Sequence, residues 1–119
     1  MKNILILEDE IAIWMLYKRK LEWVWFEVQH ALNPDQMDEI LKEFKPDIFL
    51  LDHWITGHEK TWTECVPELR KKFPDSGIFI LSNYWERDLK LKFPWGEFSP
   101  DEYLLKLNCS PRWLVEFLS

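Results

Sequence analysis

Five residues with reactive or metal-binding side chains stand at or near the ends of short apolar runs: Glu8, Asp9, Asp52, Ser82 and Lys106. A carboxylate at the end of a buried run is costly to place unless something holds its charge. Grouped carboxylates also repel one another, and Mg²⁺ suits a site built from a few carboxylates, waters and a phosphoryl oxygen. With a lysine and a hydroxyl beside them, Asp52 could attack a phosphorus atom and form an acyl phosphate whose developing charge is neutralised.

The elements that must position these residues alternate between strand and helix. Apolar, β-branched runs predict strands, and the segments between them have helical periodicity or helix-capping residues. The predicted strands are 2–7, 26–31, 46–52, 77–82 and 102–107, and the predicted helices are 11–23, 34–44, 64–73, 85–93 and 112–119. Asn33 and Thr63 are the expected N-caps of the second and third helices, and Ser110 with Pro111 should open the last one.

Five strands that alternate with five helices predict an α/β fold with a parallel sheet covered on both faces. Five strands are too few for the eight-stranded barrel, so we expect an open, doubly wound, flavodoxin-like sheet of order 2-1-3-4-5. In that order the first and third strands are neighbours, and ligands bind beyond their carboxyl ends. Glu8, Asp9 and Asp52 should therefore converge in one crevice, with Ser82 and Lys106 arriving from its far side.

Composition limits the class of protein. The 119 residues are 47% hydrophobic, and we expect one domain spanning 1–119 that stands alone, without an output domain. The chain lacks an apolar stretch of membrane-spanning or signal-peptide length, which predicts a cytoplasmic protein with Cys65 and Cys109 as reduced thiols. The net charge of −6 argues against binding of nucleic acid or an anionic membrane by this domain.

The order and spacing of these residues resemble the receiver domain of two-component response regulators over nearly the whole chain. The family has an acidic pair after the first strand, a phosphorylated aspartate after the third, a Ser or Thr after the fourth and a lysine in the fifth. Glu8 with Asp9, then Asp52, Ser82 and Lys106 occupy those places, and the stretches "PDIFLLD" and "DEYLLK" match closely.

The resemblance implies that a sensor histidine kinase or a phosphotransfer protein donates a phosphoryl group to Asp52. It implies Mg²⁺ as cofactor, held by Glu8, Asp9, Asp52 and the backbone carbonyl of Trp54, with Ser82 and Lys106 as the other catalytic residues. It also implies a switch in which Tyr103 swings inward as Ser82 moves toward the phosphoryl group.

Two further consequences of the resemblance concern surfaces. The fourth helix, the fifth strand and the last helix, with Tyr103 and Trp113, should form a signalling face that supports a possible homodimer. Trp54 and Tyr84 occupy the places that flank the path of the hydrolytic water, and their bulk should hinder both that water and small phosphodonors.

The sequence departs from the family pattern at some positions and leaves alternatives open. Thr56 and Leu107 stand where the family usually has prolines. A degenerate receiver that acts as a phosphorylation-independent interaction module is one alternative. A metal-dependent phosphatase is another, although His53 is a poor substitute for the second acid it needs, and a transition-metal site with His53 and His58 matches no defensible ligand spacing. The expected class is therefore a signalling domain rather than an enzyme.

Overall fold

A computed structural model describes residues 2–8, 11–52, 62–82, 102–105 and 110–118. Some residues within these ranges are described through their backbone only: 11, 13, 14, 52, 62–64, 82, 102, 103, 105 and 111. The strands are β1 (Asn3–Leu7), β2 (Glu27–Ala31), β3 (Ile48–Asp52), β4 (Gly77–Ser82) and β5 (Glu102–Leu105). The helices are α1 (Ile11–Trp23), α2 (Pro34–Ile40), α3 (Trp62–Lys72) and α5 (Pro111–Leu118). The predicted helix 85–93 lies outside the described residues.

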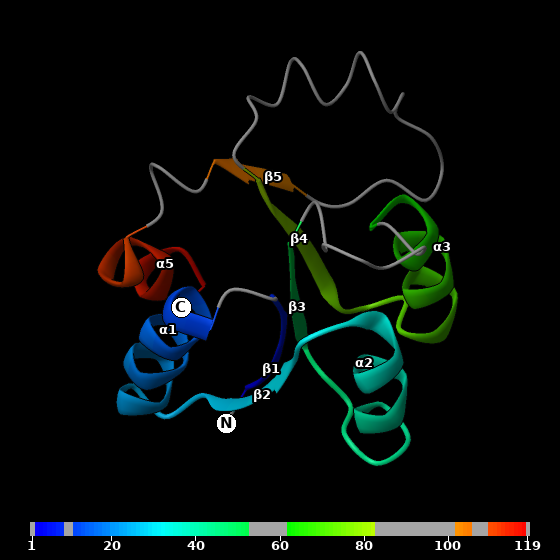
Figure 1. Ribbon diagram of the computed structural model, residues 1–119, viewed down its shortest axis with the longest axis horizontal. Helices are drawn as coiled ribbons and strands as arrows, with labels where there is room; N and C mark the ends of the chain where they lie inside the picture. Colours follow the sequence, from blue (N-terminus) through cyan, green and yellow to red (C-terminus); the bar gives the residue numbers. More distant parts are fainter. Residues whose placement is uncertain (1, 9–10, 53–61, 83–101, 106–109, 119) are drawn as a thin grey trace.

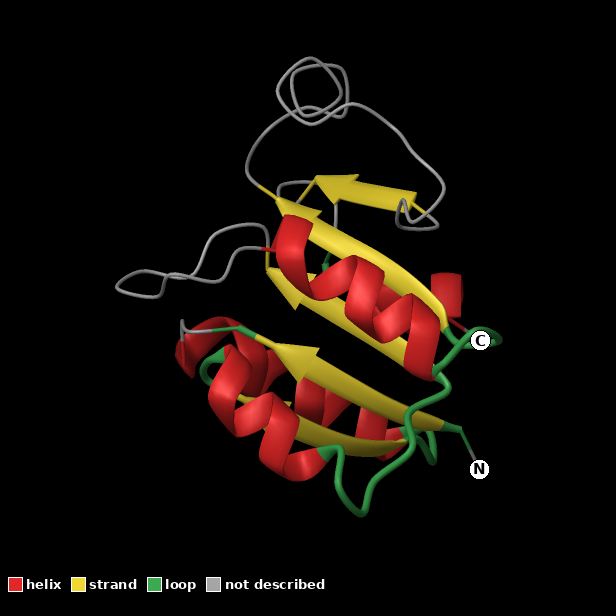
Figure 2. Ribbon diagram, turned by 90° about the vertical axis from the view of Figure 1, so that its right-hand side faces the viewer, coloured by secondary structure: helices red, strands yellow, loops and turns green. Residues whose placement is uncertain are grey.

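The strands form one parallel sheet of order β2-β1-β3-β4-β5, which confirms the predicted fold class and strand order. Helices α1 and α5 lie against one face of the sheet, and α2 and α3 lie against the other (Figures 1 and 2). A parallel strand needs a crossover connection, and α1, α2 and α3 supply it between β1 and β4, while α5 follows the last strand and helps to cover one face.

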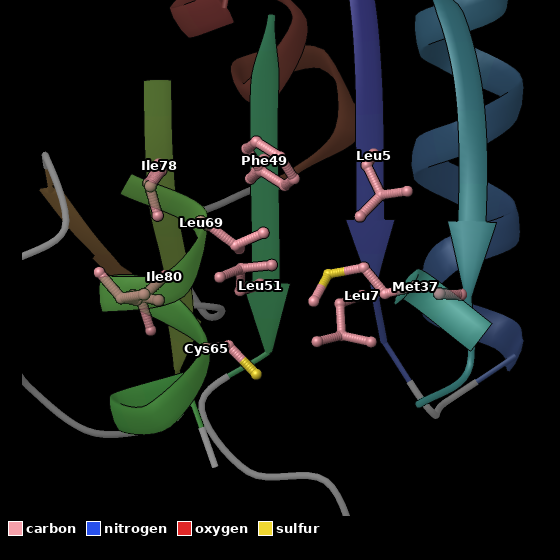
Figure 3. Packing of buried hydrophobic residues seen from close by; sticks show 11 residues of the cluster. Leu5, Leu7, Met37, Phe49, Leu51, Cys65, Leu69, Ile78 and Ile80 are labelled. Carbon is pink, nitrogen blue, oxygen red and sulfur yellow. The ribbon is translucent and has the colours of Figure 1, made fainter. Parts of the chain in front are cut away.

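Alternation along the strands divides the core into two clusters, because successive side chains in a strand point to opposite faces. Odd-numbered residues of β1 and β3 join even-numbered residues of β4 beneath α2 and α3, where Figure 3 shows them packed around Met37, Cys65 and Leu69. The other cluster lies beneath α1 and α5 and contains Ile4, Ile6, Tyr17, Leu21, Leu50, Leu81, Leu104, Leu114 and Leu118. Both faces of the central strands are therefore buried, in agreement with their unbroken apolar sequences.

Two of the predicted helix starts are confirmed by their hydrogen bonds. The Asn33 side chain accepts from the main-chain N–H of Gln36 at 2.9 Å, and the Ser110 hydroxyl accepts from that of Trp113 at 3.1 Å. The prediction for Thr63 is wrong, because α3 begins at Trp62 and so includes Thr63. Among the described helices, none is long and apolar enough to cross a bilayer.

The end of α1 has a tryptophan where helices usually place glycine. The N–H of Trp25 donates to the carbonyl of Glu22 at 3.1 Å, and the N–H of Phe26 donates to that of Leu21 at 3.1 Å. This pair of bonds is a Schellman motif, whose penultimate residue adopts the left-handed conformation. Trp25 has φ 73°, and its side chain is 79% exposed, so it combines backbone strain with little burial.

The carboxyl end of β1 is held to β2 by two hydrogen bonds. The N–H of Glu8 donates to the carbonyl of Ala31 at 3.1 Å, and Nε2 of His30 donates to the carbonyl of Glu8 at 2.8 Å. Partial burial lowers the pKa of His30 below its ordinary value of 6.5, although the bond to Glu8 opposes that shift and nearby Lys18 adds to it.

Replacing Trp25 with glycine should stabilise the fold. Glycine adopts positive φ without the contact between Cβ and the carbonyl oxygen, so Trp25→Gly should raise the free energy of unfolding by about 1 kcal/mol. Urea denaturation followed by circular dichroism measures the change. Trp25→Ala, which keeps the Cβ, is the matched control and should change stability much less; equal effects of the two variants would contradict the strain.

His30 should make stability depend on pH in the mildly acidic range. Its pKa is lower in the folded state, so the unfolded chain binds the proton more readily, and stability rises with pH. The contribution is fully present above the unfolded pKa, about 6.5, and is lost as pH falls through the folded pKa. Urea midpoints measured at about pH 7.5 and about pH 5.5 should differ less in His30→Gln than in the wild type. An unchanged difference would contradict this role for His30.

Candidate functional site

Strand register brings the predicted site residues to one edge of the sheet. Leu7 of β1 pairs with Leu51 of β3, so Glu8 and Asp52 each follow the last pair of these neighbouring strands. Asp52 pairs in turn with Leu81 of β4, and Ser82 comes one residue later. Because adjacent strands lie about 4.8 Å apart, the backbones at these three positions form a row along the carboxyl edge. The predicted convergence of the first, third and fourth strand ends is therefore present in the backbone.

The row continues toward β5. Ser82 pairs with Leu105, the last described residue of β5. Lys106 follows directly in sequence and lies outside the described residues. Tyr103 pairs with Ile80, two residues back from that edge.

Glu8 is the one charged residue that is buried within the described part of the chain. Its side chain is 1% exposed, at the end of a strand whose apolar residues are also buried. Removing a carboxylate from water costs several kcal/mol unless opposite charge or hydrogen bonds compensate. Its main-chain N–H donates to the carbonyl of Ala31, and its carbonyl accepts from the imidazole of His30. The protein thus holds a carboxylate in place at the edge where Asp52 ends β3.

The donor chemistry at this edge fits a hard divalent cation. Carboxylate oxygens are the ligands that Mg²⁺ prefers. Asp9 follows Glu8 in sequence, and Asp52 ends the neighbouring strand β3. Asp9 and Trp54 lie outside the described residues, as do His53 and His58. Among the side chains that are described, no group of three His, Cys, Asp or Glu residues could hold a metal.

Two features escaped the sequence interpretation. His30 showed no obvious chemistry in the sequence, yet its imidazole secures the backbone of Glu8; the parallel pairing of β1 with β2 was the signal that could have revealed it. The second is the outward face of α1, which carries exposed Leu16 and Trp23. Helical periodicity alone showed that 11–23 is a helix, but not which of its apolar residues remain in solvent.

Comparison with known sequences identifies a distant bacterial relative. No protein-family profile matches the chain. The phosphate regulon transcriptional regulatory protein PhoB of Pseudomonas aeruginosa is 32% identical over 116 residues, which cover 96% of this chain and 48% of that protein. The chain therefore spans about half the length of the curated relative it matches.

Comparison with solved structures adds two informative neighbours. The chemotaxis response regulator CheY4 of Vibrio cholerae superposes with a TM-score of 0.83 at 19% identity, covering 99% of this chain and 96% of that one, which supports the fold alone. The response regulator TrrA of Thermotoga maritima, solved in complex with Mg²⁺–BeF, is 30% identical with a TM-score of 0.71, covering 89% of this chain and 87% of that one. With this level of identity over most of both chains, the protein belongs to the response regulator receiver family.

Proposed function

We propose that this receiver accepts a phosphoryl group on Asp52 from a sensor histidine kinase or a phosphotransfer protein. As a member of its family the chain is a signalling module rather than a classical enzyme. The observation that carries the proposal is the row of strand ends, which brings Asp52 between buried Glu8 and the end of β4. The same edge is where ligands bind in doubly wound sheets.

Asp52 is the nucleophile in this proposal. A carboxylate oxygen of Asp52 forms a bond to phosphorus as the bond from phosphorus to the donor's imidazole nitrogen breaks, and the neutral imidazole keeps the departing electron pair. Ser82 and Lys106 donate hydrogen bonds to the phosphoryl oxygens, which gain negative charge as the bonds exchange. Water later attacks phosphorus, the bond from phosphorus to the Asp52 oxygen breaks, and inorganic phosphate leaves as Asp52 returns to its carboxylate form.

Glu8, Asp9, Asp52 and the backbone carbonyl of Trp54 would hold Mg²⁺. The ion, when bound, neutralises the charge that gathers where carboxylates meet a phosphoryl group. Buried Glu8 fits this role because its carboxylate is already removed from water and supported by the fixed end of β1. The structure of TrrA with Mg²⁺–BeF supports the same ligand chemistry for this chain.

The output of the switch is proposed to be a protein-interaction surface. Ser82 ends β4 and Tyr103 lies in β5, so movement at Ser82 can reach the adjacent edge strand. Helix α5 carries Trp113, which is 38% exposed and stacks on Phe117 with ring centroids 5.0 Å apart. A half-exposed indole is a common interface anchor, and this face is the proposed site of homodimerisation.

Phosphoryl transfer to Asp52 can be tested with beryllofluoride and Mg²⁺. We expect saturable, Mg²⁺-dependent binding in the wild type and none in Asp52→Ala, measured by calorimetry. Acetyl phosphate or a cognate kinase should add a phosphoryl group detected by intact mass, and Asp52→Asn should remain unmodified. Asp75→Asn, at an exposed position before β4, is the matched control and should behave as the wild type. Absent binding would favour a phosphorylation-independent interaction module. Labelling that persists in Asp52→Asn would overturn Asp52 as the phosphoryl acceptor.

The aromatic residues Trp54 and Tyr84 should control access to the acyl phosphate. Removing both rings opens the path for in-line attack by water and for small donors, so Trp54→Ala/Tyr84→Ala should speed both dephosphorylation and acetyl phosphate loading. An increase of roughly tenfold corresponds to about 1.4 kcal/mol of barrier. Phosphoprotein decay and loading are followed by phosphate-affinity gels, with Trp113→Ala as control. If neither rate rises, these rings do not restrict the access of water or small donors to Asp52.

A further inference from the structure

The turn between α1 and β2 presents three consecutive apolar residues to solvent. Trp23 and Trp25 are 80% and 79% exposed, and Val24 between them is exposed as well. Trp113, the other tryptophan whose side chain is described, is exposed to only half that extent. The turn lies at the margin of the molecule on the side of the N-terminus (Figure 1). We call Trp23, Val24 and Trp25 the tryptophan turn.

The tryptophan turn is fixed from its inner side. The N–H groups of Val24 and Phe26 both donate to the carbonyl of Leu21, at 3.2 Å and 3.1 Å. Leu21 is completely buried, and Phe26 packs against the cluster that contains it, as commonly occurs beneath a Schellman motif. The backbone of the turn is therefore ordered before any binding event, so binding would cost little conformational entropy.

Trp25 keeps its indole against the preference of its backbone. Glycine adopts a φ of 73° without strain, whereas a residue with a Cβ does not. Strained residues persist mostly where function requires them, and contiguous exposed apolar residues mark interaction sites. The tryptophan turn is therefore a candidate for insertion into an apolar environment outside the domain.

Two cations accompany the tryptophan turn. Arg19 and Lys20 line the same shallow groove as Trp23, with a volume of about 350 Å³. Neither forms a salt bridge with another residue that the structure describes, whereas neighbouring Lys18 pairs with Glu22 at 3.5 Å. The apolar turn thus has available positive charge directly beside it.

The net charge of −6, which argues against membrane binding by the domain as a whole, is unevenly distributed. Four acids belong to α2 and the turn that follows it, on the opposite face of the sheet from α1 (Figure 1): Asp35, Asp38, Glu39 and Glu43. Physiological salt screens exposed charges beyond about 8 Å. Because the shortest extent of the domain is 28 Å, these acids do not cancel the attraction of an anion to Arg19 and Lys20.

From these observations we infer that the tryptophan turn inserts into the interface of a phospholipid bilayer, with Arg19 and Lys20 against anionic headgroups. Indoles concentrate at the boundary between headgroups and acyl chains, and basic side chains are attracted to anionic lipid. Each signal alone gives marginal attachment, whereas an apolar insertion combined with basic residues gives reversible peripheral binding. A fluid lipid layer adapts to two projecting rings, whereas a protein partner would need a matching cavity for each.

The proposed membrane contact leaves the phosphorylation site accessible. Helix α1 runs from the carboxyl end of β1 back to the start of β2, so the tryptophan turn lies at the amino edge of the parallel sheet. Asp52 ends β3 at the carboxyl edge. A domain attached through the turn would therefore direct Asp52 away from the bilayer.

The test is sedimentation of the full chain with phospholipid vesicles. We expect the protein to sediment with vesicles of phosphatidylcholine and phosphatidylserine, and at least about threefold less with phosphatidylcholine alone. Tryptophan emission should shift to shorter wavelengths on binding, because indoles leave water for a less polar layer. Failure to sediment with the anionic vesicles would overturn the proposal.

Variants separate the tryptophan turn from the rest of the molecule. Trp23→Ala and Trp25→Gly should each weaken vesicle binding roughly tenfold. Trp25→Gly is the sharper of the two, because it should stabilise the fold while it weakens binding. Lys20→Glu should also weaken binding, whereas Lys45→Glu, the same charge reversal at an exposed position after α2, should not. Wild-type binding by Trp25→Gly, or equal losses in the two charge reversals, would overturn the proposal.

Two further measurements distinguish a bilayer from a second copy of the chain and from the phosphorylation switch. Sedimentation equilibrium without lipid should give the same mass for the wild type and Trp23→Ala; self-association that Trp23→Ala abolishes would replace the bilayer with a second copy. Trp23→Ala should bind beryllofluoride as the wild type does, which keeps the turn separate from the site at Asp52. Because the vesicle test uses unphosphorylated protein, its result does not depend on whether Asp52 accepts a phosphoryl group.

Discussion

Parallel pairing of β1 with β2 on one side and with β3 on the other is the constraint that the rest of the structure depends on. Ile4 lies opposite both Val28 and Ile48, and Ile4, Leu5 and Ile6 are completely buried. A one-residue slip in either pairing would exchange the residues that face α1 and α5 with those that face α2 and α3. Because both faces are dry, such a slip would have to rebuild two clusters at once, and the register is therefore strongly specified.

The same register creates the chemical edge of the molecule. With β1 and β3 adjacent, the connections that leave them run to opposite faces of the sheet, and an open edge remains where Glu8 and Asp52 follow the last paired residues. A buried acid such as Glu8 opposes folding, and its position is secured by main-chain bonds to Ala31 and His30. The folding free energy lost by burying this acid is consistent with a binding site that concentrates negative charge.

Helix α1 serves the core on one side and solvent on the other. Tyr17 and Leu21 are buried against the sheet, in the same cluster as Leu114 and Leu118 of α5. The opposite side carries exposed Leu16 and Trp23, and the helix ends in a left-handed tryptophan rather than a glycine. Neither the exposed apolar residues nor the strained residue is explained by packing within the domain.

The sequence by itself determined the alternation of strands and helices and the set of strand-end residues, because apolar runs and caps are local signals. The expected strand order came from the doubly wound class of fold that this alternation indicates. Asn33 and Ser110 could be identified as caps for the same reason. Thr63 was wrongly predicted as a cap because it is a typical N-cap residue, whereas Trp62, where α3 begins, carries no local signal for a helix start. Tertiary structure decided what depends on distant pairing: the burial of Glu8, the link from His30 to its carbonyl, and which side of α1 meets water. A helix of apolar and basic residues can bury several faces, and only the sheet that it packs against selects one.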